Sequence, residues 1–365
     1  MTRNKPYLWM IAVTLLLSHI SFSQNLKPGF DKEEYRQLMY ISARTGALDT
    51  SYYSGIPEPA IFRKVYRSPV MGLDNLWDLW TDNNTTAVIS IRGTTAKAES
   101  WLANVYAAMV PAKGELNLSK NDVFKYDLAA DPKAAVHVGW LLSMAYLSED
   151  IVPKIDSCYK AGIRNILLMG HSQGGAINFL LTSYLYSLQK QNLIPADIRF
   201  KTYCSAGPKP GNLYYAYSYE ALTQNGWAYN VVNSADWVPE APFSVQTIHD
   251  FNTTNPFTNV KPIIKKQKFF RRVLFRHVYN RLNKPSRRAQ RNYEKWLGKM
   301  TAKIVRKNLP EFIPPAYYGS NDYVRTGNTI VLFADADYYK KFPDDPKTIF
   351  VHHFHKAYLY LLDKL

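Results

Sequence analysis

The chain has 365 residues, 47% of them apolar, which is enough to bury one large core or two small ones. Its 45 basic and 29 acidic residues give a formal net charge of +16, and this excess of positive charge requires an explanation. Two cysteines are too few for a disulfide framework, and no spacing of histidine with cysteine or aspartate matches a known metal-ligand set.

The N-terminus has the layout of a secretory signal peptide. Two basic residues precede an apolar run over residues 7–17, and small residues that suit cleavage follow at 21–24. The apolar run is too short for a confident membrane-spanning helix. The sequence therefore predicts that residues 1–23 are a signal peptide and that the protein is secreted or periplasmic. An uncleaved segment that anchors the protein in a membrane is the alternative.

Helical and strand patterns alternate along the rest of the chain. The predicted helices cover residues 31–46, 133–159, 176–188, 213–221 and 354–362. The predicted strands cover residues 60–67, 73–80, 86–91, 166–169, 198–204, 227–232 and 329–333. This alternation predicts an α/β fold with a mainly parallel sheet and helices on both faces. We expect Cys158 and Cys204 to be small buried side chains, although export would permit a disulfide.

A tight turn connects the strand at 166–169 to the following helix. Its sequence, Gly170-His171-Ser172-Gln173-Gly174, has the pattern G-x-S-x-G, which in this context is typical of a serine nucleophile. The turn leaves almost no room for side chains beside the serine, which explains the two glycines. It directs the N–H of Gln173 at the place where a negative charge would form. We therefore expect Ser172 to be a nucleophile.

A serine nucleophile needs a histidine base and an acid that orients it. In this architecture the acid and then the histidine follow the serine in the chain. Asp236 follows the strand at 227–232 and so lies at the carboxyl edge of the sheet, whereas Asp197 precedes its strand. Three histidines come between the last strand and the last helix, where the base is expected: His352, His353 and His355.

These residues resemble the class 3 (fungal-type) lipases, which are serine esterases of the α/β-hydrolase fold. Five segments are similar to motifs of that family and occur in the same order: 88–94 (strand ending in R-G-T), 101–104 (W-x-x-N), 136–140 (V-H-x-G-W), 170–174 (G-H-S-Q-G) and 233–239 (N-x-x-D-x-V-P). The resemblance covers about residues 86–239 and resumes near the C-terminal histidines. Gln173 departs from the family pattern, which usually has leucine at this position.

The resemblance implies a catalytic triad of Ser172, Asp236 and His353. The family histidine stands about five residues before a Tyr-Leu pair, as His353 does, and His352 and His355 remain alternatives.

The resemblance also implies an oxyanion hole. Thr94 would donate its backbone N–H and hydroxyl, and Gln173 would donate its backbone N–H, so that the change from leucine alters packing and not the donor. The mechanism requires no cofactor and no metal.

The resemblance further implies that residues 96–113 form a helical lid over the acyl site. Apolar side chains recur there at helical spacing, so that an amphipathic lid would cover apolar surface until a lipid interface displaces it. An ordinary core helix is the alternative.

The positive charge is concentrated in residues 261–310, which we interpret as an insertion in a hydrolase domain spanning 24–365. This segment holds 17 of the 45 basic residues and one acidic residue, Glu294, so the remainder of the chain is balanced. Apolar residues recur among the charges in the pattern of a basic amphipathic helix: Phe269, Phe270, Val273, Leu274, Val278 and Leu282. We expect the segment to bind an anionic membrane surface. An inert solvated insertion is the alternative, and nucleic acid is not expected as a partner of an exported protein.

Taken together, the sequence predicts a secreted serine esterase that hydrolyses carboxylic ester bonds of lipids through an acyl-enzyme, as a triacylglycerol lipase or phospholipase A does. A feruloyl-type or general carboxylesterase is the enzymatic alternative. The non-enzymatic alternative is a catalytically silent protein of the same fold that binds a membrane surface. Such a protein would tend to lose a member of the catalytic triad, and the sequence has all three.

Overall fold

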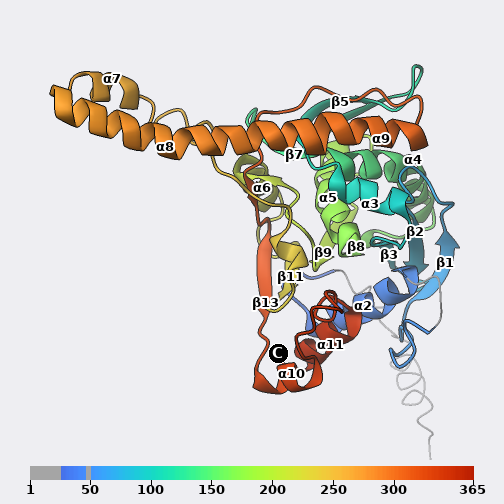
Figure 1. Cartoon of the computed structure of the whole chain (residues 1–365). Coiled ribbons are helices and arrows are strands. Elements are labelled where there is room, and N and C mark those ends of the chain that lie inside the picture. Colours follow the sequence, from blue (N-terminus) through green and yellow to red (C-terminus); the bar gives the residue numbers. More distant parts are fainter. Residues whose placement is uncertain (1–25, 47–50) are drawn as a thin grey trace, which may run out of the picture.

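A seven-stranded sheet forms the centre of the computed structural model, which describes residues 26–46 and 51–365 (Figure 1). The predicted signal peptide, residues 1–23, lies outside the described residues. The strand order is β1-β2-β3-β8-β9-β11-β13; the β1–β2 and β2–β3 pairings at one edge are antiparallel, and the remaining pairings are parallel. The strands are β1 (Arg63–Arg67), β2 (Trp77–Thr81), β3 (Thr86–Ile91), β8 (Asn165–His171), β9 (Arg199–Ser205), β11 (Ala228–Asn233) and β13 (Asn328–Leu332).

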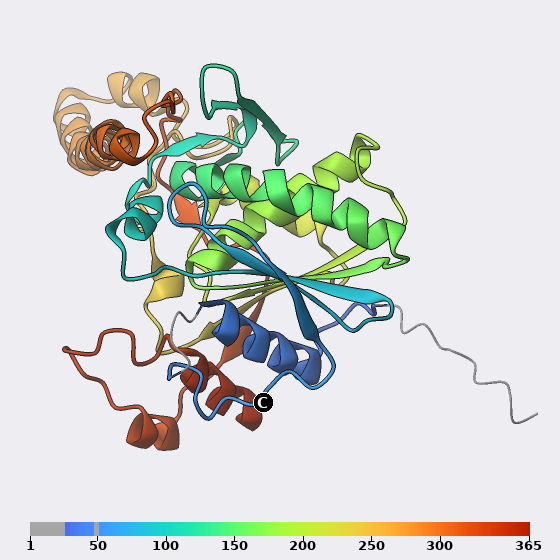
Figure 2. The ribbon, with the colours of Figure 1, turned by 90° about the vertical axis from the view of Figure 1, so that its right-hand side faces the viewer.

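Helices cover both faces of this sheet, which Figure 2 shows nearly edge-on. One face carries α4 (Val138–Lys160), α5 (Gln173–Lys190) and α6 (Leu213–Leu222). The other face carries α2 (Lys32–Gly46) and α11 (His355–Lys364), with α10 (Ala336–Lys341) beside them. Two apolar cores result, one on each face of the sheet. The strands β3, β8 and β11 are buried along their whole length, as expected for parallel strands covered on both faces. The predicted α/β-hydrolase fold is therefore confirmed.

Smaller sheets extend this frame. A second, antiparallel sheet joins β12 (Tyr323–Val324), β10 (Gly211–Asn212), β7 (Ala135–His137) and β4 (Met109–Pro111). A hairpin joins β5 (Lys113–Asn117) and β6 (Val123–Asp127). The prediction of a helix over 133–159 was wrong at its start, because residues 135–137 pair in this second sheet and the helix begins at Val138.

The helix predicted over 96–113 is much shorter than expected. It forms α3 (Ala98–Val105), and the chain then enters β4. Met109 and Val110 are fully buried and pair with β7, so they belong to the core and not to a lid. Their spacing fits a helix, but the neighbouring strand β7 offers hydrogen-bond partners that the spacing does not reveal.

The strand predicted over 73–80 begins only at Trp77, because residues 71–75 form a turn. The helix predicted over 31–46 and the buried state expected for the two cysteines agree with the structure. Helix α2 is capped by Asp31, whose side chain accepts hydrogen bonds from the backbone N–H groups of Glu33 and Glu34, both at 2.9 Å. Cys158 and Cys204 are buried and free.

The basic segment contains α7 (Val260–Lys265), α8 (Phe269–Tyr293), the π-helix η2 (Glu294–Met300) and α9 (Thr301–Asn308). Helix α8 extends well beyond the body of the molecule, and α7 lies near its far end (Figure 1). Within the described ranges, no helix is both long enough and apolar enough to cross a membrane.

Candidate active site

Ser172 lies in the sharp turn between β8 and α5. Its backbone has φ 62° and ψ −132°, a strained conformation for a residue with a side chain. A Cβ atom on Gly170 would lie 2.2 Å from the carbonyl oxygen of Gly174, and one on Gly174 would lie 2.3 Å from the carbonyl oxygen of Ile91. The expectation that the turn has no room for side chains beside the serine is therefore confirmed. Because Gln173 is the first residue of α5, no carbonyl of that helix accepts its backbone N–H.

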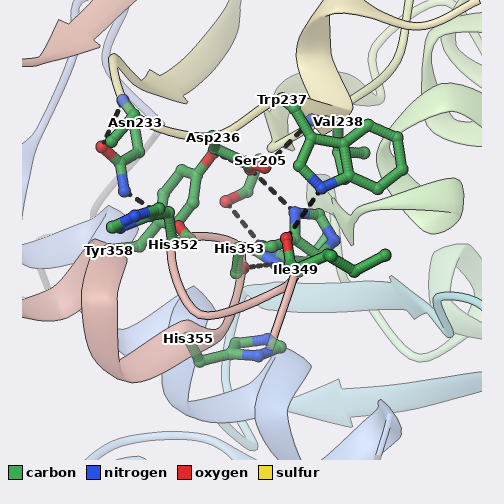
Figure 3. Close-up of polar contacts among 12 residues, drawn as sticks. Ser205, Asn233, Asp236, Trp237, Val238, Ile349, His352, His353, His355 and Tyr358 are labelled. Atoms are coloured by element: carbon green, nitrogen blue, oxygen red, sulfur yellow. Dashed lines mark hydrogen bonds and ion pairs between the residues drawn. The ribbon is translucent and has the colours of Figure 1, made fainter. Parts of the chain in front are cut away.

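Asp236 and His353 form a buried pair next to this turn (Figure 3). Asp236 follows β11, just before the short 3₁₀-helix η1 (Val238–Glu240), and His353 immediately precedes α11. The two residues are joined at 2.7 Å between His353 Nδ1 and Asp236 Oδ2. Because a carboxylate can only accept, Nδ1 carries the proton and Nε2 is the basic nitrogen. In the part of the chain that the structure describes, Ser172 Oγ has no hydrogen bond to His353, although both residues line the same cavity.

The neighbouring histidines have both ring nitrogens occupied. His352 contacts Tyr338 Oη through Nδ1 at 2.9 Å and Asp344 Oδ1 through Nε2 at 2.9 Å. His355 contacts Tyr52 Oη at 2.8 Å and Ser42 Oγ at 3.1 Å, and burial lowers the pKa of His355 to about 3. Of the three candidate histidines, His353 is therefore the one whose basic nitrogen is not already held by another described side chain.

The predicted oxyanion residue Thr94 lies at the end of a polar network. Asn104 Nδ2 donates to Thr94 Oγ1 at 2.9 Å, which leaves the threonine proton free to donate elsewhere. The Oδ1 atom of Asn104 accepts from Trp140 Nε1 at 3.0 Å and from Gln173 Nε2 at 3.1 Å. These two donors fix the orientation of the Asn104 amide. The Gln173 side chain thus does more than fill space, since it also donates to the carbonyl of Ser100 at 3.0 Å.

These side chains border a cavity of about 630 Å³, a size typical of small-molecule sites. Thr94, Ser172, Gln173 and His353 contribute to its wall. Aromatic residues form much of the remainder: Tyr52, Trp101, Trp140, Trp237, Phe350 and Phe354. The reactive groups therefore face an apolar space.

Three residues at the site were not assigned a role from the sequence. Tyr358 Oη donates to Asp236 Oδ2 at 2.8 Å, and His171 Nε2 donates to the backbone carbonyl of His353 at 2.8 Å. Burial lowers the pKa of His171 well below its usual value, so this imidazole is neutral. Asn104 is the third, and its place in the W-x-x-N segment was the one feature that could have marked it.

His137 belongs to the V-H-x-G-W segment and lies just before α4. It is fully buried, and its Nδ1 accepts the backbone N–H of Trp140 at 3.3 Å, which caps α4. Its ring stacks on Trp140, and its Nε2 contacts the carbonyl of Asn104 at 3.2 Å. His137 therefore supports the site through Asn104 and not through the serine turn.

Comparison with known proteins relates part of this chain to a known family. The model of the lipase (class 3) family matches residues 88–246, a range that includes Thr94, Ser172 and Asp236. No curated protein matches the chain at a significant level. The fold and the serine turn define an α/β hydrolase, and within that class residues 88–246 are similar to the class 3 lipases.

Several solved fungal lipases are similar to the chain. The triacylglyceride lipase of Rhizomucor miehei is 19% identical, with 59% of this chain and 77% of that one covered and a TM-score of 0.43. The Lip2 lipase of Yarrowia lipolytica is 18% identical, with 60% and 77% covered and a TM-score of 0.44. The lipase of Rhizopus microsporus var. chinensis is 20% identical, with 58% and 69% covered and a TM-score of 0.40.

Proposed function

We propose that this protein is a serine esterase that hydrolyses carboxylic ester bonds of lipids, of the triacylglycerol lipase or phospholipase A type. The observation that carries the proposal is that Ser172 and His353 lie at the wall of one apolar cavity, with His353 bound to the buried Asp236. The match of residues 88–246 to the model of the class 3 lipases supports the same reaction class.

In the proposed mechanism, His353 Nε2 removes the proton of Ser172 as the hydroxyl oxygen attacks the ester carbonyl. The backbone N–H groups of Thr94 and Gln173, together with the Thr94 hydroxyl, stabilise the negative charge on the carbonyl oxygen. The ester C–O bond then breaks, the leaving alcohol takes the proton from His353, and the acyl group stays on the serine. Water, deprotonated by the same imidazole, releases the acid and restores the serine.

The walls of the cavity suggest which acyl groups it accepts. An apolar lining favours an aliphatic chain through burial of its surface. The aromatic side chains of Trp101, Trp237 and Phe350 would also contact an aryl acyl group. We therefore keep a feruloyl-type esterase as a second candidate and distinguish the two by substrate.

The test compares hydrolysis of p-nitrophenyl esters with short, long and aromatic acyl groups. We expect Ser172→Ala and His353→Ala to lower kcat by more than about a thousandfold, because each removes a group that acts in every step. The controls His352→Gln and His355→Gln should retain most of the rate in protein that remains folded. A higher kcat/KM for long aliphatic esters than for aromatic ones supports a lipase. Equal hydrolysis by the wild type and Ser172→Ala would show that the protein is a catalytically silent member of the fold.

We also propose that the protein is exported, on the basis of the predicted signal peptide. N-terminal sequencing of the protein expressed in a secreting host should begin at Gln24, and replacing residues of the apolar run 7–17 with charged ones should keep the protein inside the cell. A mature protein that retains Met1 and sediments with membranes would support the anchored alternative.

A further inference from the structure

The most unusual feature outside the active site is a projecting helical arm, which we define as residues 260–293 (α7 and α8). Helix α8 continues through η2 and α9, so that residues 269–308 form one helical rod about 60 Å long at 1.5 Å per residue. The C-terminal part of the rod crosses the body, and the arm extends past its edge (Figure 1).

The rod is fixed to the body at its C-terminal end. Val305 is fully buried, and Ala302 is nearly so. Ala108 donates its backbone N–H to the carbonyl of Leu297 at 3.2 Å, and the backbone of Gly298 lies too close to Ala108 for a side chain. In contrast, no residue of α8 is buried. The arm is therefore held at the end where Tyr293 packs against the body, and none of the residues of α8 is fully covered.

Exposed apolar side chains form a row along the arm. Four of them are spaced by four residues, and their exposed fractions are 85%, 58%, 47% and 73%: Phe270, Leu274, Val278 and Leu282. Residues at this spacing lie on neighbouring turns of one helix face. Because apolar surface is normally buried, a row of this kind on a monomeric protein marks a contact surface.

The same arm carries an unbalanced positive charge. Twelve basic residues lie between Lys261 and Arg291, and no acidic residue lies among them. None of these twelve makes a salt bridge with any described residue, and the nearest acidic residue, Glu294, pairs with Lys299 in η2. The partner of this surface must therefore supply both negative charge and an apolar phase.

The arm also has a fixed position relative to the cavity. Helix α9 contacts α3, and Trp101 of α3 forms part of the cavity wall. In Figure 2 the rod is seen along its axis, on the same side of the molecule as α3 and the loop that leads into α11. A surface that binds the arm would therefore lie on the side of the molecule where the cavity is.

We propose that the arm docks the protein onto the surface of an anionic lipid bilayer. Its basic residues contact the negative headgroups, and the row that begins at Phe270 inserts at the boundary between headgroups and acyl chains. A nucleic acid would satisfy the charges but leave the apolar row exposed to water. The docking itself does not depend on the reaction. Only the further claim that docking brings lipid esters to the cavity rests on the proposed function.

The first test measures sedimentation of the full chain carrying Ser172→Ala with vesicles, so that binding is read without hydrolysis. We expect binding to vesicles of phosphatidylcholine with about one third phosphatidylglycerol, weak binding to phosphatidylcholine alone, and loss of binding at high salt. Replacing Arg271, Arg272 and Arg276 with glutamine should weaken binding at least about tenfold, because each basic residue near such a surface contributes about fivefold. Replacing the exposed Lys27, Lys64 and Lys190 of the body removes the same charge and should change binding little.

The second test separates a bilayer from other anionic partners. Replacing the four residues of the apolar row with glutamine keeps every charge, and we expect it to weaken binding to anionic vesicles by at least about tenfold. The proposal would be overturned if the wild-type protein bound duplex DNA tightly and this variant bound both DNA and anionic vesicles as well as the wild type does. Absence of vesicle binding by the wild type would also overturn it. Ester hydrolysis is measured separately with soluble substrates, so a failure of docking is not confused with a failure of the proposed function.

Discussion

Two donors share one oxygen of the Asp236 carboxylate, and this arrangement gives Tyr358 a role in positioning the base. His353 Nδ1 and Tyr358 Oη both lie within 2.8 Å of Asp236 Oδ2, while Oδ1 accepts the backbone N–H of Val238 at 3.0 Å. Burial and the neighbouring carboxylate raise the pKa of the Tyr358 hydroxyl well above its usual value. Tyr358 is therefore a neutral donor over the whole working pH range.

This contact leads to a prediction for Tyr358→Phe. Without the hydroxyl, more of the negative charge of Asp236 faces His353 and stabilises its protonated form, so we expect the acidic limb of the kcat/KM profile to move to higher pH. Looser alignment of the imidazole should lower kcat/KM at neutral pH by about tenfold, which is the effect of about 1.4 kcal/mol. The control is Tyr360→Phe, two residues later on another face of α11, whose side chain makes no hydrogen bond to Asp236 among the described residues. A lower rate with an unshifted acidic limb would show that the Tyr358 hydroxyl is only structural.

At the scale of elements, the lid predicted from the sequence is a short helix attached at several points. Gln173 links the start of α5 to α3 through Ser100 and Asn104, and α3 also contacts α4 and α9. Gln173 occupies the position where the resemblance leads us to expect leucine. A leucine side chain could not donate these hydrogen bonds to α3, so they depend on the glutamine of this chain. We infer that α3 is held in place by side-chain hydrogen bonds as well as by its apolar contacts.

We therefore predict that Gln173→Leu loosens α3. Each lost hydrogen bond contributes about 1 kcal/mol, so the backbone amides of Leu102 and Val105 should exchange hydrogen about tenfold faster or more. The amides of α4 should be unchanged. Gln189→Leu is a matched control, because Gln189 lies at the other end of α5 and its side-chain amide likewise donates two hydrogen bonds, both to backbone carbonyls. Unchanged exchange in α3 would contradict the inference that Gln173 holds it.

At the scale of the whole molecule, three buried neutral histidines make stability depend on pH. Burial lowers the pKa of His137 and His355 to about 3 and that of His171 well below its usual value. Between about pH 6.5 and pH 3 the unfolded chain binds protons at these sites and the folded protein does not. Stability is therefore fully present above this range and decreases as the pH falls through it.

We predict that the free energy of unfolding falls by up to about 1.4 kcal/mol per pH unit for each of these histidines below pH 6. Chemical denaturation at several pH values measures this slope. His355→Gln keeps a hydrogen-bonding side chain but cannot titrate, so it should make the slope shallower. The same substitution at the exposed His277 of α8 should not change it. An identical slope in the wild type and His355→Gln would contradict the prediction.

The sequence by itself determined the features that depend on local geometry. The alternation of apolar patterns predicted the central sheet and the helices that cover it. The pattern G-x-S-x-G predicted the serine turn, because only glycine fits beside so sharp a reversal. The position of Asp236 after a parallel strand predicted the edge of the sheet on which it lies.

Only the tertiary structure decided which partners each side chain meets. Three histidines within four residues were all candidates for the base, and their surroundings differ because His353 meets Asp236, His352 meets Asp344 and His355 meets Tyr52 in the folded chain. The same holds for Gln173, whose hydrogen-bonding partners lie about seventy residues earlier in the chain. The length of α3 was also decided in this way, since the pairing of β4 with β7 ends the helical segment. Local patterns fix the backbone of short segments, but side-chain contacts depend on how those segments pack together.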